Sequence, residues 1–351
     1  MQFIVIKDII CNMDDETKVV YEAPPFHRRV IANLMDIMIF VLFFIGIFIP
    51  TNAIAKNTKS YINSNQIINT VREESGFYIY EPSTKTYMTY PTYYDNYAAD
   101  ASGYVKATTC ATAIDDFINF VGENVGDSAK EEIQKNYDEY RLSLTYNDVP
   151  YFVKENGVVV SNKYSELESD KKCMATNDDY YRNVYHIYIL QDCAGYLLVY
   201  FPEYKAANTN VSNILFFIEI PIAYFMSGLI TYFIPPLIFK RGGKTLGKLA
   251  FRIGLIDNTL FCPSIGKIIA RFSIFFFGEM VLSLFTFGIP FIISFSMMVF
   301  SKRKQGFPDY MLGLVEVDTS KNNIYFNKYE ASVYQFDGSS KGIDFHIREQ
   351  K

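Results

Sequence analysis

Three acidic residues stand inside stretches of the sequence that are otherwise apolar. Asp36 lies about two turns into the first stretch, Glu219 lies near the start of a second, and Glu279 lies deep in a third, FFFGEMVLSL. An ionisable group at membrane depth costs roughly 2.5 to 3.5 kcal/mol on insertion scales, so each needs a partner or a function. Desolvation favours the protonated carboxyl group, so proton or cation exchange is the chemistry that such residues can carry.

Arg29 is the nearest cation to Asp36 in the sequence. It precedes Asp36 by seven residues, which places both on one helical face at a separation of about 10 Å along the axis. We therefore expect them to share a polar cluster without touching. A structural role for Asp36, in fixing how helices dock, is one interpretation. Proton or cation exchange during transport and a signal for membrane topology are the others.

Glu219 and Glu279 differ in their expected depth. Glu219 follows the predicted start of its helix by six residues, which favours a position near the membrane interface. Glu279 lies deeper in its run. If it faces Asp36 across the helix bundle, the two carboxyl groups form a cation path; a position near an interface is the alternative.

Residues 30–56 form the first predicted transmembrane helix. The run has the length of about 20 apolar residues that a bilayer requires, and Arg28 and Arg29 stand directly before it, whereas Lys56 and Lys59 behind it are a weaker cluster. The positive-inside rule then places residues 1–29 in the cytoplasm. Alternating apolar and polar residues before Pro24 predict a small hairpin in this N-terminal segment.

Residues 57–212 have a different composition and predict a soluble domain outside the cytoplasm. They contain 22 Asp or Glu against 13 Lys or Arg and no spanning run. Apolar residues at helical spacing predict helices over 110–125 and 127–144. Strands are predicted at 76–80, 151–154, 157–160 and 184–190. Together these elements indicate an inserted extracytoplasmic α+β domain.

The second half of the chain returns to the membrane. Residues 213–239 are the second predicted transmembrane helix, and the basic residues after it place the loop 240–266 in the cytoplasm. Residues 267–301 are too long for one comfortable span, and Gly288 and Pro290 divide them, which favours a hydrophobic hairpin over a single tilted span. Residues 302–351 follow as a cytoplasmic C-terminal tail with predicted strands at 314–317 and 323–326.

These segments predict a multi-pass protein of the cell membrane. The expected fold is an α-helical integral membrane core of four transmembrane helices, alternatively three, with the inserted extracytoplasmic α+β domain. A net charge of -5 argues against nucleic acid as a partner. The sequence shows no pairing of nucleophile and base, no Cys or His cluster with metal-ligand spacing and no cofactor loop, so neither an enzyme, a metal site nor a cofactor is predicted.

Two smaller features of the sequence carry predictions. Lys244, Lys248 and Arg252 recur every four residues, which predicts a basic amphipathic element that lies on anionic headgroups, with a solvated loop as the alternative. Among the cysteines of the extracytoplasmic segment, Cys173 and Cys193 are the first candidates for a disulfide, because the intervening loop is short. The odd number of thiols there weakens that pairing.

Three segments in this order resemble the RDD family of membrane proteins, named for one Arg and two Asp. They are PPFHRRVIANLMD at the first helix, GGKTLGKLAFRIGLID after the second, and SKRKQGFPDYMLGLVEVD after the last. The resemblance covers roughly residues 24–56 and 213–318 and leaves out the inserted domain. The last segment departs from the family pattern at Pro308, Leu312 and Leu314.

The resemblance identifies Arg29 as the family arginine, Asp36 as the first aspartate and Asp309 as the second. If Asp309 lies at the inner face, it completes an arginine flanked by two carboxylates, an arrangement that suits the planar guanidinium. What the resemblance implies about activity is transport, with cation/proton exchange in some members. Two hypotheses follow: transport of a small solute or cation coupled to protons, and binding or sensing of an envelope ligand by the extracytoplasmic domain. The lipid bilayer is the expected partner in both.

Overall fold

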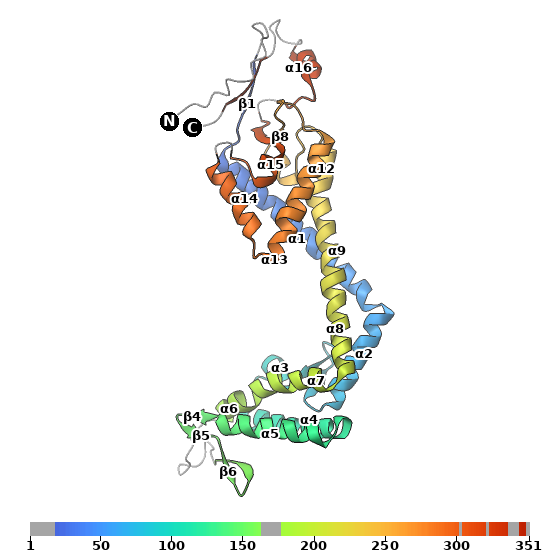
Figure 1. Cartoon of the computed structure of the whole chain (residues 1–351), viewed down its shortest axis with the longest axis vertical. Coiled ribbons are helices and arrows are strands. Elements are labelled where there is room, and N and C mark those ends of the chain that lie inside the picture. Colours follow the sequence, from blue (N-terminus) through green and yellow to red (C-terminus); the bar gives the residue numbers. More distant parts are fainter. Residues whose placement is uncertain (1–17, 163–176, 302–303, 321–322, 336–343, 349–351) are drawn as a thin grey trace. The chain divides into compact units, whose positions relative to one another are not determined.

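The computed structural model describes residues 18–162, 177–301, 304–320, 323–335 and 344–348 (Figure 1). The protein is mostly helical, and its helices divide into two compact units. Unit 1 consists of Met1–Asn52 and Glu219–Lys351, and unit 2 is the intervening segment Ala53–Ile218. The predicted hairpin around Phe3–Ile6 lies outside the described residues.

Three helices of the described part are long and apolar enough to cross a membrane. They are Phe26–Lys56, Pro202–Ile238 and Ile265–Phe285, with 31, 37 and 21 residues. Their outward faces expose large apolar side chains, such as Leu42 at 68% and Phe217 at 76%. Apolar faces of this extent are suited to lipid rather than water. The prediction of a multi-pass membrane protein is confirmed at this level.

The second and third of these helices are each built from several segments. The second comprises α8 (Pro202–Ile214), η3 (Leu215–Glu219), α9 (Ile220–Gly228), η4 (Leu229–Phe233) and α10 (Ile234–Ile238); the third comprises α12 (Ile265–Ser273), η5 (Ile274–Val281) and α13 (Leu282–Phe285). The η segments are π-helical, and such turns occur often at functional sites. The second helix begins eleven residues before the predicted Asn213, because Pro202 is well placed to open it.

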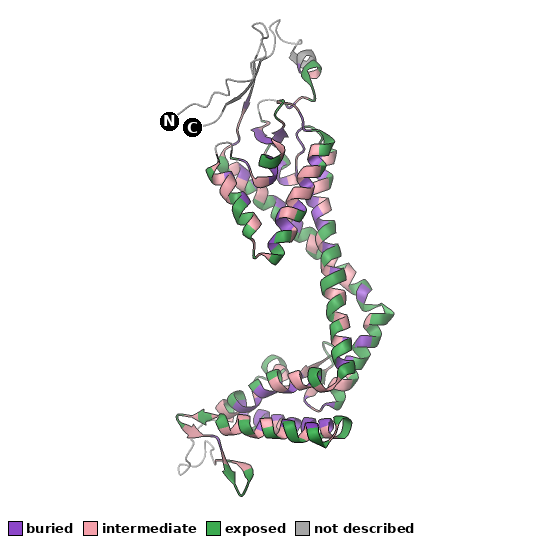
Figure 2. Ribbon diagram, in the orientation of Figure 1, coloured by how far each residue is buried: buried purple, intermediate pink, exposed green. Residues whose placement is uncertain are grey.

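The block 267–301 forms two helices, as the hairpin prediction required. Gly288 adopts the left-handed conformation, with φ at 84°, and separates α13 from α14 (Ile289–Phe300). Within α14 only Ser294 and Met298 are buried, and Figure 2 shows the exposed residues along it. At 12 residues, α14 is shorter than the roughly 20 that a span requires, so the described helices of spanning length number three.

A small layer of short helices and strands covers one end of the unit 1 helices. It contains α11 (Leu246–Ala250), α15 (Phe307–Leu312) and an antiparallel pair of strands, β8 (Ile253–Ile256) and β9 (Val315–Asp318). Tyr21, Ile256 and Val317 form its buried core. The strand predicted at 314–317 is confirmed. The strand predicted at 323–326 is wrong, because this stretch forms a loop that packs Ile324 into the same core.

The two ends of the described chain meet in unit 1. β1 (Lys18–Glu22) pairs in parallel with β10 (Asp344–Arg348), and α16 (Lys328–Gln335) precedes β10. The alternation at Val19–Tyr21 therefore does form a strand. Its partner lies more than 300 residues away in the sequence, and only tertiary structure could supply it.

Unit 2 is a helical domain whose described strands form three two-stranded antiparallel sheets. Its elements are α2 (Lys59–Glu74), β2 (Tyr78–Glu81), β3 (Thr86–Thr89), α3 (Tyr90–Tyr97), α4 (Gly103–Val125), α5 (Asp127–Ser143), β4 (Thr145–Tyr146), β5 (Val149–Pro150), β6 (Phe152–Glu155), β7 (Val158–Ser161), α6 (Asn177–Tyr180), η1 (Tyr181–His186), η2 (Ile189–Cys193), α7 (Ala194–Tyr200) and α8, together with the end of α1 and most of η3. Each described sheet has two strands. The predicted helices over 110–125 and 127–144 and the strands near 78, 152 and 158 are present.

The strand predicted at 184–190 is wrong, because this segment is helical in η1 and η2. Its buried residues are Tyr181, Val184, Tyr185, Tyr188 and Ile189, which recur at intervals of three and four. This spacing places them on one helical face against α4 and α5. The β-branched and aromatic composition favoured a strand, and packing against the core overrode it.

The cysteine prediction for unit 2 is not supported. Cys173 lies outside the described residues, and Cys193 is a free thiol with no exposed surface. Burial raises the pKa of the Cys193 thiol well above its ordinary value. Burial likewise raises the pKa of Cys110, to about 12. Both side chains pack as small apolar groups in the core of unit 2.

Candidate functional site

Asp36 of α1 (Phe26–Lys56) joins the first spanning helix to the start of α11. Its Oδ2 accepts a hydrogen bond from Thr245 Oγ1 at 2.5 Å, and its Oδ1 accepts one from Gly247 N at 2.7 Å. Thr245 is itself the N-cap of α11. A carboxylate at a helix N-terminus satisfies free N–H groups and matches the positive end of the helix dipole. Asp36 therefore docks the Gly-Lys-Thr-Leu-Gly-Lys segment onto α1.

Gly247 permits this docking because it has no side chain. A Cβ atom at this position would lie 2.2 Å from Ala32 O and 2.9 Å from Asp36 Oδ1. We expect Gly247→Ala to destabilise unit 1 by about 1–3 kcal/mol, as overpacked sites do. Comparison of unfolding midpoints in detergent checks this. Gly266→Ala is the matched control, since a Cβ there meets only Ser264 Oγ at 3.9 Å, and equal midpoints for both variants would contradict the close approach.

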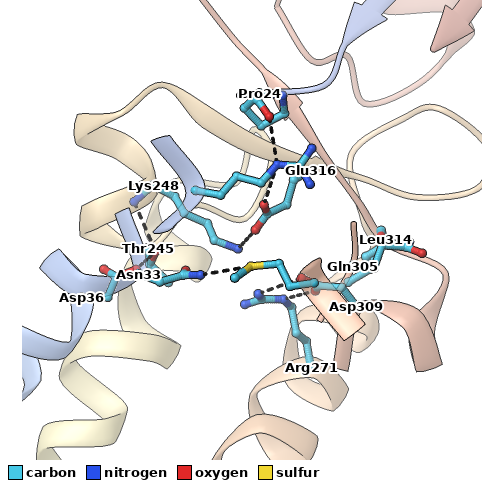
Figure 3. A network of polar contacts seen from close by, with 12 residues as sticks. Pro24, Asn33, Asp36, Thr245, Lys248, Arg271, Gln305, Asp309, Leu314 and Glu316 are labelled. Atoms are coloured by element: carbon cyan, nitrogen blue, oxygen red, sulfur yellow. Dashed lines mark hydrogen bonds and ion pairs between the residues drawn. The ribbon is translucent and has the colours of Figure 1, made fainter. Parts of the chain in front are cut away.

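Arg29 and Lys248 converge on Glu316 of β9. Lys248 Nζ lies 2.5 Å from Glu316 Oε1, and Arg29 Nε lies 3.5 Å from Glu316 Oε2. Arg29 also donates to two backbone carbonyls, from Nε to Pro24 O at 3.1 Å and from Nη1 to Lys304 O at 2.9 Å. All three side chains are less than 10% exposed. They form a buried three-residue ion cluster, and Figure 3 shows Lys248 and Glu316 within it.

Asp309 of α15 pairs with Arg271 of α12. Arg271 Nε and Nη2 contact Asp309 Oδ1 at 2.5 Å and Oδ2 at 3.3 Å, a two-pronged geometry drawn in Figure 3. Burial alone raises the pKa of Asp309, but the adjacent Arg271 guanidinium and the more distant Lys248 reverse this, and the pKa of Asp309 lies below its ordinary value. The carboxylate is thus held in its charged form.

Glu279 lies on η5, two turns after Arg271 in the same continuous helix. Its side chain is 3% exposed, and its Oε1 has no hydrogen-bond partner among the described residues. Arg271 and Asp309 act on it electrostatically, and Ser294 of α14 is its hydrogen-bonding neighbour. Glu279 therefore borders the charged network, and none of the described cations pairs with it directly.

Glu219 occupies a separate place on the second spanning helix. It is 1% exposed, and its Oε2 accepts a hydrogen bond from Asn52 Nδ2 of α1 at 2.7 Å. An amide donor thus satisfies this carboxyl group within unit 1. The position of Glu219 near the membrane interface stays a prediction.

The structure brings together the four residues predicted as an ion or proton site, but with different partners. Asp36, Arg29, Asp309 and Glu279 all belong to or border one network. The direct contacts differ from the predicted arginine flanked by two aspartates, because Arg29 contacts Glu316 and acts on Asp309 through its charge, whereas Asp309 contacts Arg271. The predicted meeting of Glu279 with Asp36 is also absent from the interactions described for these two residues.

The prediction for the basic loop is corrected at Lys248. This side chain is 4% exposed and neutralises Glu316, so it is not available to lipid headgroups. Lys244 donates from Nζ to Thr319 Oγ1 at 2.8 Å. Arg252 is exposed, as predicted. The spacing of four residues was read as a helical face, but α11 ends at Ala250 and β8 begins at Ile253.

Arg271, Glu316 and Thr245 were not predicted as site residues from the sequence. Arg271 left a signal, since it is an isolated cation in the run KIIARFSIFFF. Glu316 left a weaker one, as the single charge within the strand Leu314–Val317. Thr245 precedes a helix start at the N-cap position, where its hydroxyl accepts from Lys248 N at 3.4 Å.

Comparison with known proteins supports the predicted resemblance. The RDD family model matches residues 186–313. This range contains Thr245, Lys248, Arg271, Glu279 and Asp309, and it begins earlier than the predicted 213. It includes neither α1, with Arg29 and Asp36, nor Glu316. No curated protein and no solved structure matches the chain.

Proposed function

Because this multi-pass membrane protein carries an RDD domain over residues 186–313, we propose that it transports a small solute or cation coupled to protons. The observation that supports this is the network of buried charges between its apolar helices. Unpaired charges at such positions are expensive, and intramembrane ionisable groups commonly mark ion or proton routes. Asp36, Asp309 and Glu279 are the carboxyl groups of the proposed route.

The proposed orientation places the N-terminus in the cytoplasm and unit 2 outside the cell membrane. Support comes from the basic residues at the ends of the helices, Arg28 and Arg29 before α1 and Lys240 and Arg241 after α10. The acidic composition of unit 2 agrees with translocation across the membrane. In this orientation the charged network lies toward the cytoplasmic ends of the helices.

Proton flux in vesicles tests the proposal. Reconstituted protein with an internal pH-sensitive dye is expected to dissipate a pH gradient when Na⁺ or K⁺ is added, above the rate of protein-free vesicles. Asp36→Asn is expected to lower this flux at least tenfold, because it removes a charge from the route. The absence of cation-dependent flux in oriented, folded wild-type protein would contradict the proposal.

A matched variant separates the charge of Asp36 from its docking role. Thr245→Val removes the hydroxyl that donates to Asp36 Oδ2 and leaves every charge in place. If flux needs the carboxylate, Thr245→Val retains most of it while Asp36→Asn does not. Equal losses in the two variants would assign Asp36 a structural role only.

Binding or sensing by unit 2 is the second candidate function. The specific observation is that unit 2 has its own hydrophobic core, with fully buried Phe77, Ile114 and Ile133. It also exposes tyrosine rings, Tyr104 at 63% and Tyr80 at 46%, and tyrosine is common at binding surfaces. Wild-type protein without flux, but with a binding partner for unit 2, would favour this function.

A further inference from the structure

Among the residues that the structure describes, the charges of the unit 1 network do not balance. Its carboxyl groups and cations are drawn from α1, α11, α12, η5, α15 and β9. The carboxyl groups are the buried Asp36, Glu279, Asp309 and Glu316, and the cations are the buried Arg29 and Lys248 and the mostly buried Arg271. With every one of these groups ionised, the described network has one more negative than positive charge. Because an uncompensated charge is costly in a medium of low dielectric constant, one carboxyl group has reason to be neutral.

Three of the four carboxyl groups have strong donors that favour their charged form. Glu316 faces the two cations Lys248 and Arg29. Asp309 receives the two-pronged guanidinium of Arg271. Asp36 accepts from the Thr245 hydroxyl and the Gly247 amide at the N-terminus of α11. Hydrogen bonds and opposite charges of this kind stabilise the carboxylate.

Glu279 lacks such donors. Its Oε1 has no hydrogen-bond partner within the described ranges, and its nearest hydroxyl, on Ser294, is a single neutral group. That hydroxyl is held in place, because it accepts a hydrogen bond from Phe307 N at 3.0 Å. Ser283, four residues after Glu279, also has a buried hydroxyl without a described partner. Among the described residues, the surroundings of Glu279 are therefore polar but carry no free cation.

The groups that face η5 from other elements confirm this. Asp309 on α15 adds a negative charge. Arg271 on α12 adds a positive charge, but its guanidinium is already paired with Asp309. On the remaining side, Tyr224 packs on Phe276 and Tyr232 packs on Phe275. These phenols bring no positive charge. Glu279 also lies within a π-helical segment, a feature common at functional sites.

We propose that Glu279 is the proton-binding residue of the membrane core and that the Arg271–Asp309 pair controls its protonation. This inference rests on the proposed transport function and assigns its proton to one residue. The step is the dissociation of one carboxylic acid into a carboxylate and a proton. While Asp309 holds Arg271, Glu279 keeps its proton; when Arg271 is released and turns toward Glu279, the proton leaves.

Infrared difference spectroscopy tests the assignment without measuring transport. In vesicles, wild-type protein is expected to show the carbonyl stretch of a protonated carboxyl group at neutral pH, and Glu279→Gln is expected to lack it. Glu203→Gln is the control, because the Glu203 side chain is exposed. Identical carboxyl bands in wild-type protein and Glu279→Gln at every pH would overturn the proposal.

Asp309→Asn tests the control by the ion pair. It frees Arg271 while keeping the side-chain size, so the Glu279 band is expected to shift to a pH at least one unit lower. An unchanged band would show that the Arg271–Asp309 pair does not control the protonation of Glu279. The two proposals fail separately, because protein with the Glu279 band but no cation-dependent flux disproves transport alone, whereas flux without the band disproves this assignment alone.

Discussion

Replacing Glu316 with alanine is expected to lower the free energy of unfolding of unit 1 by about 5 kcal/mol. The change would leave two buried cations, Lys248 and Arg29, without their shared carboxylate. Removal of one partner of a buried ion pair costs about 3–5 kcal/mol, and here two cations lose their partner. Far-UV circular dichroism in mixed micelles with increasing sodium dodecyl sulfate measures the change.

An exposed glutamate is the matched control for this variant. Glu139 pairs with Lys135 at 3.8 Å, but both side chains are more than 60% exposed. Glu139→Ala is expected to leave the unfolding midpoint unchanged, since exposed pairs contribute little. Glu316→Gln keeps a hydrogen-bond acceptor, so its unfolding midpoint is expected to lie between those of Glu316→Ala and Glu139→Ala. If Glu316→Ala and Glu139→Ala have the same unfolding midpoint, the buried ion cluster does not stabilise unit 1.

Replacing Asp309 with alanine is expected to cost about 3 kcal/mol, the lower end of the range for a broken buried pair. The lower end applies because the Arg271 side chain keeps 16% exposure and can recover some hydration. The double variant Arg271→Met with Asp309→Leu is expected to unfold close to the wild type, since apolar replacement of a whole buried pair is often neutral. A double variant as unstable as Asp309→Ala would contradict this account of the pair.

The pH dependence of stability provides a second measurement of the same pair. The pKa of Asp309 is lowered in the folded protein, with burial opposed by the stronger attraction of Arg271. The stabilisation that the Asp309 carboxylate contributes is therefore fully present above the ordinary carboxyl pKa. It is lost as the pH falls through the lowered pKa of the folded protein. Wild-type protein should lose stability in acid more steeply than the double variant does. Parallel pH profiles would show that the pair is not the cause.

Local patterns in the sequence predicted the membrane character and most of the helices. Spans of apolar residues, the break at Gly288 and the alternation at Val315–Val317 each depend on near neighbours in the chain, and each appears in the structure. Local motifs also pointed to Arg29, Asp36 and Asp309, which all lie in or beside the charged network. The segment 184–190 shows the limit of this reasoning, since its composition favours a strand and its packing makes it a helix.

By itself, the sequence determined that Asp36 and Glu279 would be buried, because a carboxyl group among the apolar residues of a spanning helix has nowhere else to lie. Only the tertiary structure decided which charges meet. Arg29 and Glu316 are 287 positions apart in the chain, and the β8–β9 pairing and the turn at Gly242–Thr245 bring Glu316 and Lys248 to α1. Pairing depends on three-dimensional distance and direction, which residue spacing does not encode across separate helices. For the same physical reason, the lack of a cation beside Glu279 became visible only once Arg271 was found bound to Asp309.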